Sequence, residues 1–211
     1  DEGNFSIGIT EYFSGPPQAP QTPDAYQSAI NASFGANASA VLAEYPLSDY
    51  GNNTQLAYNR VSTDPSACRS LHVEKLWAQR VPLYAYEFNY EDAPYYFPQM
   101  PGFKAGAAHT IDIQFLFPNW HGGPLGVNLD QSSGKPRELN NQESKLSDQL
   151  VAAWTNFAKT GNPNGKGNSP WPRFTTNAQT FLSQNLQLST LSATDYRTIY
   201  KCDFWDPLLT Y

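Results

Sequence analysis

The sequence lacks the features that define several large classes of protein. None of its apolar runs approaches the roughly 20 residues that a membrane helix needs, so we expect no membrane span. Basic residues are few: 13 Lys and Arg stand against 19 Asp and Glu, and the formal net charge is −6. This balance lacks the positive charge typical of a nucleic-acid-binding protein. No signal-peptide pattern precedes Asp1, so we expect an upstream segment that has been removed or lies on another chain.

Motifs for cofactor and metal chemistry are also missing. The sequence contains neither a phosphate-binding loop nor a dinucleotide-binding fingerprint. Its 3 histidines are scattered and its 2 cysteines lie far apart, which matches no zinc-ligand spacing. The serine nucleophile motif Gly-x-Ser-x-Gly is absent, because the nearest string, around Ser6, has one residue too many before the serine. We therefore expect no metal and no cofactor.

Apolar residues are plentiful enough to form a folded core. Hydrophobic residues make up 40% of the chain and aromatic residues 14%, which excludes general disorder at this length. The sequence shows no repeat, no low-complexity tract and no long linker. Residues 1–211 are therefore predicted to form one compact unit rather than two domains.

Periodicity predicts alternating helices and strands. A helix is predicted over residues 144–159, ending before Gly161. A second helix is predicted over residues 66–79, with Leu71, Val73 and Leu76 toward the core. Apolar, aromatic segments at 81–88 and 113–117 are predicted as buried strands. This alternation favours an α/β architecture, although the strands are too few for a complete large domain.

The three histidines differ in their surroundings. His72 is interpreted as an ordinary surface residue of a helix, and His121, within Trp-His-Gly-Gly-Pro, as part of a turn. His109 follows the small residues Gly106 to Ala108 and precedes an apolar run, as is typical of a general base held on an anchored loop. A structural role for His109 remains the alternative at this point.

Two features bear on the cellular compartment. Cys68 and Cys202 permit one intramolecular bridge, the alternative being two buried free thiols. Four Asn-x-Ser/Thr motifs make an oxidising compartment reasonable. These candidate N-glycosylation sites are Asn4, Asn31, Asn37 and Asn52.

A series of short motifs occurs in a recognisable order throughout nearly the whole chain. The motifs are Asp1 to Phe5, Tyr45-Pro46, Ser62 to Asp64 with Cys68, Pro82 to Phe88, Gly106 to His109, Ile113 to Phe117, Thr160 to Asn164 with Trp171-Pro172, and Lys201 to Trp205. This order resembles that of the type-B carboxylesterases, the carboxylesterase and cholinesterase branch of the α/β-hydrolases, and it is specific to their C-terminal portion.

The resemblance implies a fold and a set of catalytic residues. It implies part of an α/β-hydrolase fold, a mostly parallel central sheet flanked by helices, incomplete without the N-terminal portion. The family's catalytic acid corresponds to Glu2 and its catalytic histidine to His109, with the serine upstream. Asp112 matches a further acidic residue of the family and is interpreted as supporting. Thr110 departs from the family's usual glycine.

The resemblance also implies a disulfide, a compartment and a partner. The family's C-terminal disulfide corresponds to Cys68–Cys202, and a secreted or periplasmic protein is expected. The expected partner is an N-terminal portion that carries the nucleophilic serine and the oxyanion loop. Residues 1–211 would then be the C-terminal segment of one catalytic domain rather than an independent unit.

The implied function is hydrolysis of carboxylic esters, with a small ester or a lipid as substrate. The alternative is a non-catalytic, cholinesterase-like binding or adhesion protein on the same fold, since fold does not decide function. Aromatic clusters line pockets in some proteins but more often form core, so no binding residues are assigned among Tyr84, Tyr86, Tyr95, Tyr96 and Phe97.

Overall fold

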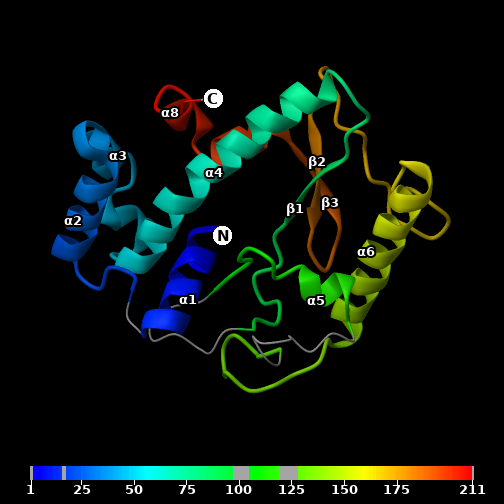
Figure 1. Ribbon diagram of the computed structural model, residues 1–211, viewed down its shortest axis with the longest axis horizontal. Coiled ribbons are helices and arrows are strands. Elements are labelled where there is room, and N and C mark those ends of the chain that lie inside the picture. The colour runs from blue at the N-terminus through cyan, green and yellow to red at the C-terminus, as the bar shows by residue number, and fades with distance from the viewer. Residues whose placement is uncertain (1, 16–17, 97–104, 119–127, 211) are drawn as a thin grey trace.

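The computed structural model of the protein describes residues 2–15, 18–96, 105–118 and 128–210, without the side chains of Glu2 and Tyr12. One long helix, α4, crosses the molecule, with a small sheet beside its C-terminal half and helix α6 beyond the sheet (Figure 1). The helical elements are α1 (Glu2–Ser14), α2 (Pro23–Phe34), η1 (Gly35–Asn37), α3 (Ala38–Glu44), η2 (Leu47–Tyr50), α4 (Thr54–Ala78), α5 (Ile113–Leu116), α6 (Asn141–Thr160), α7 (Ala193–Ile199) and α8 (Cys202–Trp205).

The described sheet is mixed and has three strands, β1 (Ala85–Phe88), β2 (Thr180–Gln184) and β3 (Ser189–Ser192). β1 pairs in parallel with β2, and β2 pairs in antiparallel fashion with β3. The strand order is β1-β2-β3, so β1 forms one edge of this sheet. The parallel pair and its long helical crossover are typical of an α/β protein, and the small size is compatible with part of a larger sheet. The strand predicted at 81–88 is confirmed over its second half.

Helix α4 is longer than its sequence pattern predicted. It runs for 25 residues from Thr54, so the predicted range of 66–79 covers only its C-terminal half. Pro65 lies inside it without ending it. Leu71 is buried as predicted, whereas Val73 and Leu76 are exposed, because residues two or five positions apart point to different sides of a helix.

Helix α6 confirms the prediction for residues 144–159. Asn140 caps its start by accepting hydrogen bonds from the backbone N–H groups of Gln142 and Glu143, and the Glu143 side chain accepts from the Asn140 backbone N–H. This reciprocal arrangement is a capping box. Gly161 ends the helix with a φ of 72°, and its backbone N–H donates to the carbonyl of Phe157, as expected for a C-terminal glycine.

The segment predicted as a strand at residues 113–117 instead contains the helix α5, Ile113–Leu116. Its backbone makes helical hydrogen bonds, since the N–H of Phe117 donates to the carbonyl of Ile113 over 2.9 Å and that of Leu116 to the carbonyl of Asp112 over 3.1 Å. The turn packs on α6, where the hydroxyl of Ser147 donates to the carbonyl of Phe115 over 2.6 Å. A short apolar run carries no periodicity that separates a helix from a strand. The helical conformation of this segment is therefore attributed to its packing on α6.

The disulfide implied by the resemblance is present. Cys68 on α4 and Cys202 on α8 are bonded, with their Cα atoms 5.4 Å apart. Both lie within the largest cluster of buried side chains, which also holds Tyr45 and Trp205. Across the residues described, no helix is long and apolar enough to span a bilayer.

Candidate functional site

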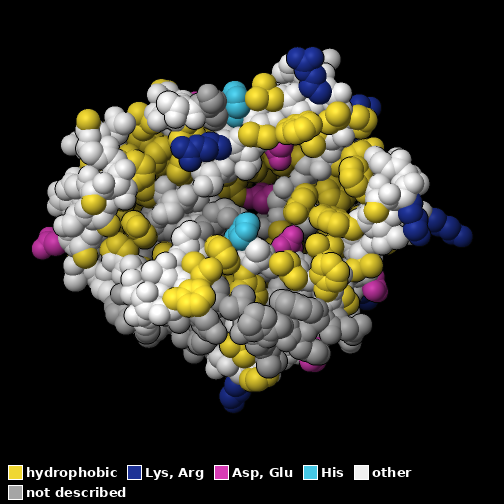
Figure 2. All heavy atoms as spheres, viewed as in Figure 1, with side chains coloured by type: hydrophobic (Ala, Val, Ile, Leu, Met, Phe, Trp, Pro, Cys, Tyr) yellow, Lys and Arg dark blue, Asp and Glu magenta, His cyan; other side chains and the backbone are white. Residues whose placement is uncertain are grey.

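A hollow of about 620 Å³ lies beside the edge strand β1. Its lining comes from α4, from β1, from the loop at 107–113, and from α7 with the residue that follows it. On the face shown in Figure 2, histidine and acidic side chains gather around a central hollow that apolar side chains surround. The hollow therefore combines titratable groups with an apolar border, a combination found at many catalytic sites.

His109 lies on the rim of this hollow. Its side chain is exposed, and its ring centroid is 4.8 Å from that of Phe5 on α1. Its backbone carbonyl accepts a hydrogen bond from the hydroxyl of Thr110, at 2.6 Å, and lies 3.3 Å from the hydroxyl of Tyr96. The backbone of this histidine is thus anchored, and the residue lines the hollow.

The first turn of α1, which begins with Glu2, is held against α4 and the histidine loop. The Gly3 N–H donates to the Thr63 hydroxyl over 3.0 Å. A Cβ atom on Gly3 would lie 2.6 Å from the carbonyl oxygen of Asn59, so glycine permits this close approach. The Asn4 amide donates to the carbonyl of Ala105 over 2.7 Å. The structure therefore brings this turn to the segment that precedes His109, while the carboxylate of Glu2 lies outside the described side chains.

Asp112 lines the hollow three residues after His109. The hydroxyl of Tyr86 on β1 donates a hydrogen bond to its carboxylate. Burial raises the pKa of Tyr86 to about 12, and the charge and hydrogen bond of Asp112 act in the same direction. Asp112 therefore ties the loop after His109 to the edge of the sheet.

Two further acidic residues line the hollow that were not identified as candidate site residues from the sequence. Burial raises the pKa of Glu74 on α4 to about 8, and burial also raises the pKa of Glu87 on β1. A signal existed for Glu87, because it is a lone charge within the apolar segment Tyr84 to Phe88. Glu74 had no such signal, since acids are common on helix surfaces.

The aromatic side chains named in the sequence analysis separate into two environments. Tyr84 and Tyr86 border a smaller recess of about 190 Å³ with aromatic residues of α6 and Trp171. Tyr95 and Tyr96 are buried in a core cluster, and Phe97 lies outside the described residues. Among the described side chains, no cluster of three or more His, Cys, Asp or Glu residues is placed to hold a metal ion. His121 also lies outside the described residues, and His72 is half-buried on α4.

The four sequons differ in exposure. Asn31, Asn37 and Asn52 are exposed, whereas Asn4 is only 5% exposed and its amide is hydrogen-bonded to Ala105. A glycan on Asn4 is incompatible with this packing, and the other three asparagines remain candidate glycosylation sites.

Comparison with known proteins identifies the family. A family model described as "Carboxylesterase family" matches residues 22–205. Carboxylesterase 3 of Pongo abelii is 37% identical over 93 residues, which cover 44% of this chain and 15% of that protein. The human cocaine esterase is 31% identical over 118 residues, covering 56% of this chain and 19% of that protein. Acetylcholinesterase of Gallus gallus is 30% identical over 144 residues, covering 67% of this chain and 16% of that protein.

These alignments take in less than a fifth of each of the three relatives. The family model, by contrast, matches most of the present chain. The chain therefore belongs to the carboxylesterase family.

Proposed function

We propose that this chain supplies the acid and the histidine of a serine ester hydrolase, with Glu2 and His109 in these roles. The observation that carries the proposal is the junction of two segments that are distant in sequence. Asn4, two residues after Glu2, donates to the carbonyl of Ala105, 101 positions away and just before His109. The ring contact between Phe5 and His109 supports the same junction.

The residues present suit acyl transfer through a covalent intermediate. His109 takes the proton of a serine hydroxyl as the serine oxygen attacks the ester carbonyl, and then gives that proton to the leaving alcohol. Glu2 accepts a hydrogen bond from the other ring nitrogen, which sets the tautomer and stabilises the imidazolium. Water, activated by the same histidine, then hydrolyses the acyl-enzyme. The substrate class is a small carboxylic ester or a lipid.

The serine and the oxyanion donors come from a partner, the N-terminal portion of the same esterase. β1 supports this assignment, because among the described residues it pairs only with β2 and leaves its other edge open beside the hollow. Unpaired strand edges are normally covered or paired in native proteins. Residues 1–211 are then the C-terminal segment of one catalytic domain. A secreted or periplasmic location agrees with the disulfide.

Replacement of His109 by Ala in the complete protein tests the proposal. We expect kcat for a p-nitrophenyl ester to fall by about 10³-fold or more, as for other triad histidines. His72→Ala is the matched control, because His72 is the other described histidine and does not line the hollow; its kcat should stay within about twofold of the parent. Retention of activity in His109→Ala would overturn the proposal.

A further inference from the structure

The backbone that leads into His109 is held by side chains rather than by a helix or a strand. Residues 105–108 are buried yet belong to no regular element. Gly106 has a φ of 64°, a left-handed conformation that glycine adopts without strain. A segment of this kind needs hydrogen-bond partners from elsewhere in the chain, since buried backbone groups are rarely left unpaired.

Gln131 supplies the partners of both backbone groups of Gly106. Its side-chain oxygen accepts from the N–H of Gly106 over 2.9 Å. Its amide nitrogen lies 3.0 Å from the carbonyl of Gly106, 2.8 Å from that of Ala93 and 3.0 Å from that of Glu91. One carboxamide therefore forms hydrogen bonds with both the N–H and the carbonyl of Gly106, as a neighbouring strand would. The same carboxamide links Gly106 to the segment that follows β1, which contains Glu91 and Ala93.

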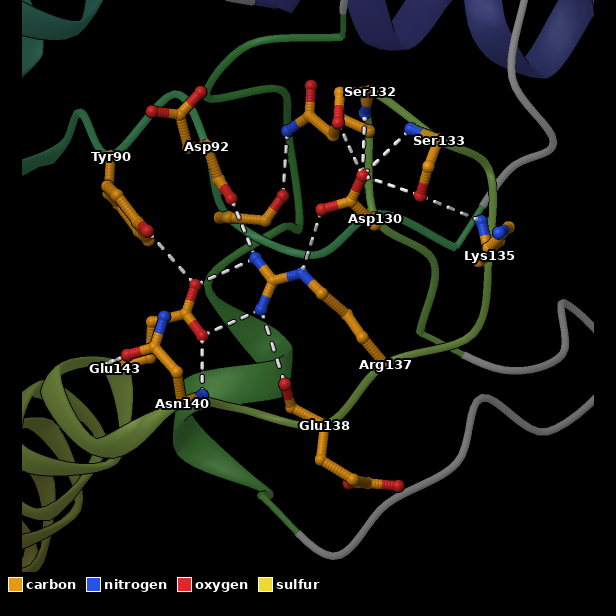
Figure 3. Close-up of polar contacts among 12 residues, drawn as sticks. Tyr90, Asp92, Asp130, Ser132, Ser133, Lys135, Arg137, Glu138, Asn140 and Glu143 are labelled. Atoms are coloured by element: carbon orange, nitrogen blue, oxygen red, sulfur yellow. Dashed lines mark hydrogen bonds and ion pairs between the residues drawn. The ribbon is translucent and has the colours of Figure 1, made fainter.

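The turn that presents Gln131 is itself fixed. Asp130 accepts hydrogen bonds from the backbone N–H and hydroxyl groups of both Ser132 and Ser133. These bonds lower the pKa of Asp130 to about 2. Figure 3 shows Asp130 between these serines and Arg137, which in turn reaches Glu143 at the start of α6. On the other side, Leu129 exchanges two backbone hydrogen bonds with Tyr95.

We infer that Gln131 is a positioning residue for His109, and this inference rests on the proposed function. Gln131 acts through Gly106: it holds the loop so that the imidazole lies where a serine proton can be transferred. Displacement of a reacting group by about 1 Å can lower a rate by 10²-fold. Loss of the Gln131 carboxamide should therefore slow the chemical step and leave ester binding almost unchanged.

The experiment compares two glutamines that each hold a loop. Gln149 on α6 accepts from the N–H of Ser169 and donates to the carbonyl of Gly167, away from the hollow. Gln131→Ala, Gln131→Met, Gln149→Ala and His109→Ala are prepared in the complete protein. Gln131→Met fills nearly the original volume without hydrogen bonds, which keeps the test valid if Gln131→Ala does not fold. Active sites are counted with a serine-reactive organophosphonate, and kcat per titrated site and KM are measured with a p-nitrophenyl ester.

We expect kcat per site to fall by about 10- to 100-fold in a folded Gln131 variant, with KM within about twofold of the parent. Gln149→Ala should change neither constant by more than about twofold. If the Gln131 variants match Gln149→Ala while His109→Ala is inactive, the positioning role is overturned and the proposed function stands. If His109→Ala retains its activity, the proposed function fails, and the positioning role with it.

Discussion

The residue that follows His109 has a conformation that its side chain disfavours. Thr110 has a φ of 67°, and left-handed backbone costs a residue with a Cβ about 1–2 kcal/mol. Its hydroxyl donates to the carbonyl of His109 and is hydrogen-bonded to the hydroxyl of Tyr96. The family resemblance places glycine here, which fits the conformation. Hydroxyl contacts thus support a backbone geometry that threonine would otherwise avoid.

A pair of substitutions at Thr110 separates strain from hydrogen bonding. Thr110→Val keeps the β-branch and the strain but loses the hydroxyl, whereas Thr110→Gly loses the hydroxyl and relieves the strain. We expect the valine variant to be less stable than the glycine variant by about 1 kcal/mol, after allowance for the greater unfolded-state freedom of glycine. Urea unfolding of the complete protein measures the difference. Equal stabilities would contradict this expectation, because the strain would then be no larger than the stability that glycine loses through its greater unfolded-state freedom.

At the scale of an element, the start of α6 depends on a buried ion pair. Glu143 is fully buried. Its two carboxylate oxygens accept from the two terminal nitrogens of Arg137 over 2.8 and 2.7 Å. The hydroxyl of Tyr90 and the N–H of Asn140 also donate to it, over 3.0 and 2.7 Å. Burial alone would raise the pKa of Glu143, but the hydrogen bonds and charge of Arg137 lower it overall.

Removal of Arg137 should therefore destabilise the protein strongly. Arg137→Ala leaves a buried carboxylate without its ion-pair partner, at a cost of about 3–5 kcal/mol in the free energy of unfolding at pH 7. Arg197→Ala is the matched control, because Arg197 pairs with Asp203 and Asp206 at the surface, where such pairs contribute about 0–1 kcal/mol. Similar losses in the two variants, measured by urea unfolding, would contradict a special role for the buried pair.

The pH dependence of this pair has a defined sign. The folded-state pKa of Glu143 lies below its ordinary value of 4.5, so its ionised form stabilises the fold above that pH. This contribution is lost as the pH falls through the lowered pKa. The difference in unfolding free energy between Arg137→Ala and the parent should therefore be largest near neutral pH and shrink on acidification. A difference that grows below pH 4.5 would contradict this origin.

At the scale of the whole molecule, several large apolar side chains of α4, β1 and α6 are exposed. Tyr86 of β1 is 39% exposed, and Phe157 of α6 is 47% exposed. Leu76 and Trp77 near the end of α4 are also more than half exposed. Tyr86 and Phe157 border the same recess, and exposed apolar surface is a feature of interaction sites, in agreement with the proposed N-terminal partner.

The chain of residues 1–211 produced alone should therefore bind a dye that reports exposed apolar surface. We expect the fluorescence of 1-anilinonaphthalene-8-sulfonate to be several-fold higher per mole with this chain than with the complete protein. Size-exclusion chromatography of the same samples reveals any self-association through the open edge. A monomeric chain with no excess dye binding would contradict the proposed partner surface and favour an independent domain.

Local signals in the sequence were sufficient to predict the helices whose capping residues and apolar periodicity lie within one segment. The helix at 144–159 is of this kind, because its apolar spacing and Gly161 lie within one segment. The ordered family motifs were sufficient to predict the disulfide between Cys68 and Cys202. His109 was also identifiable as a candidate, because small residues precede it and an apolar run follows it.

Tertiary packing alone decided the remaining features. Ile113–Leu116 form a helix that packs on α6, where Ser147 donates to the carbonyl of Phe115, and the short apolar run carries no periodicity that predicts this. Gln131 lies in an ordinary polar turn of the sequence, and only the fold brings its carboxamide to Gly106. Both outcomes depend on contacts between segments that are distant along the chain, and the free energy of such contacts is absent from any short stretch of sequence.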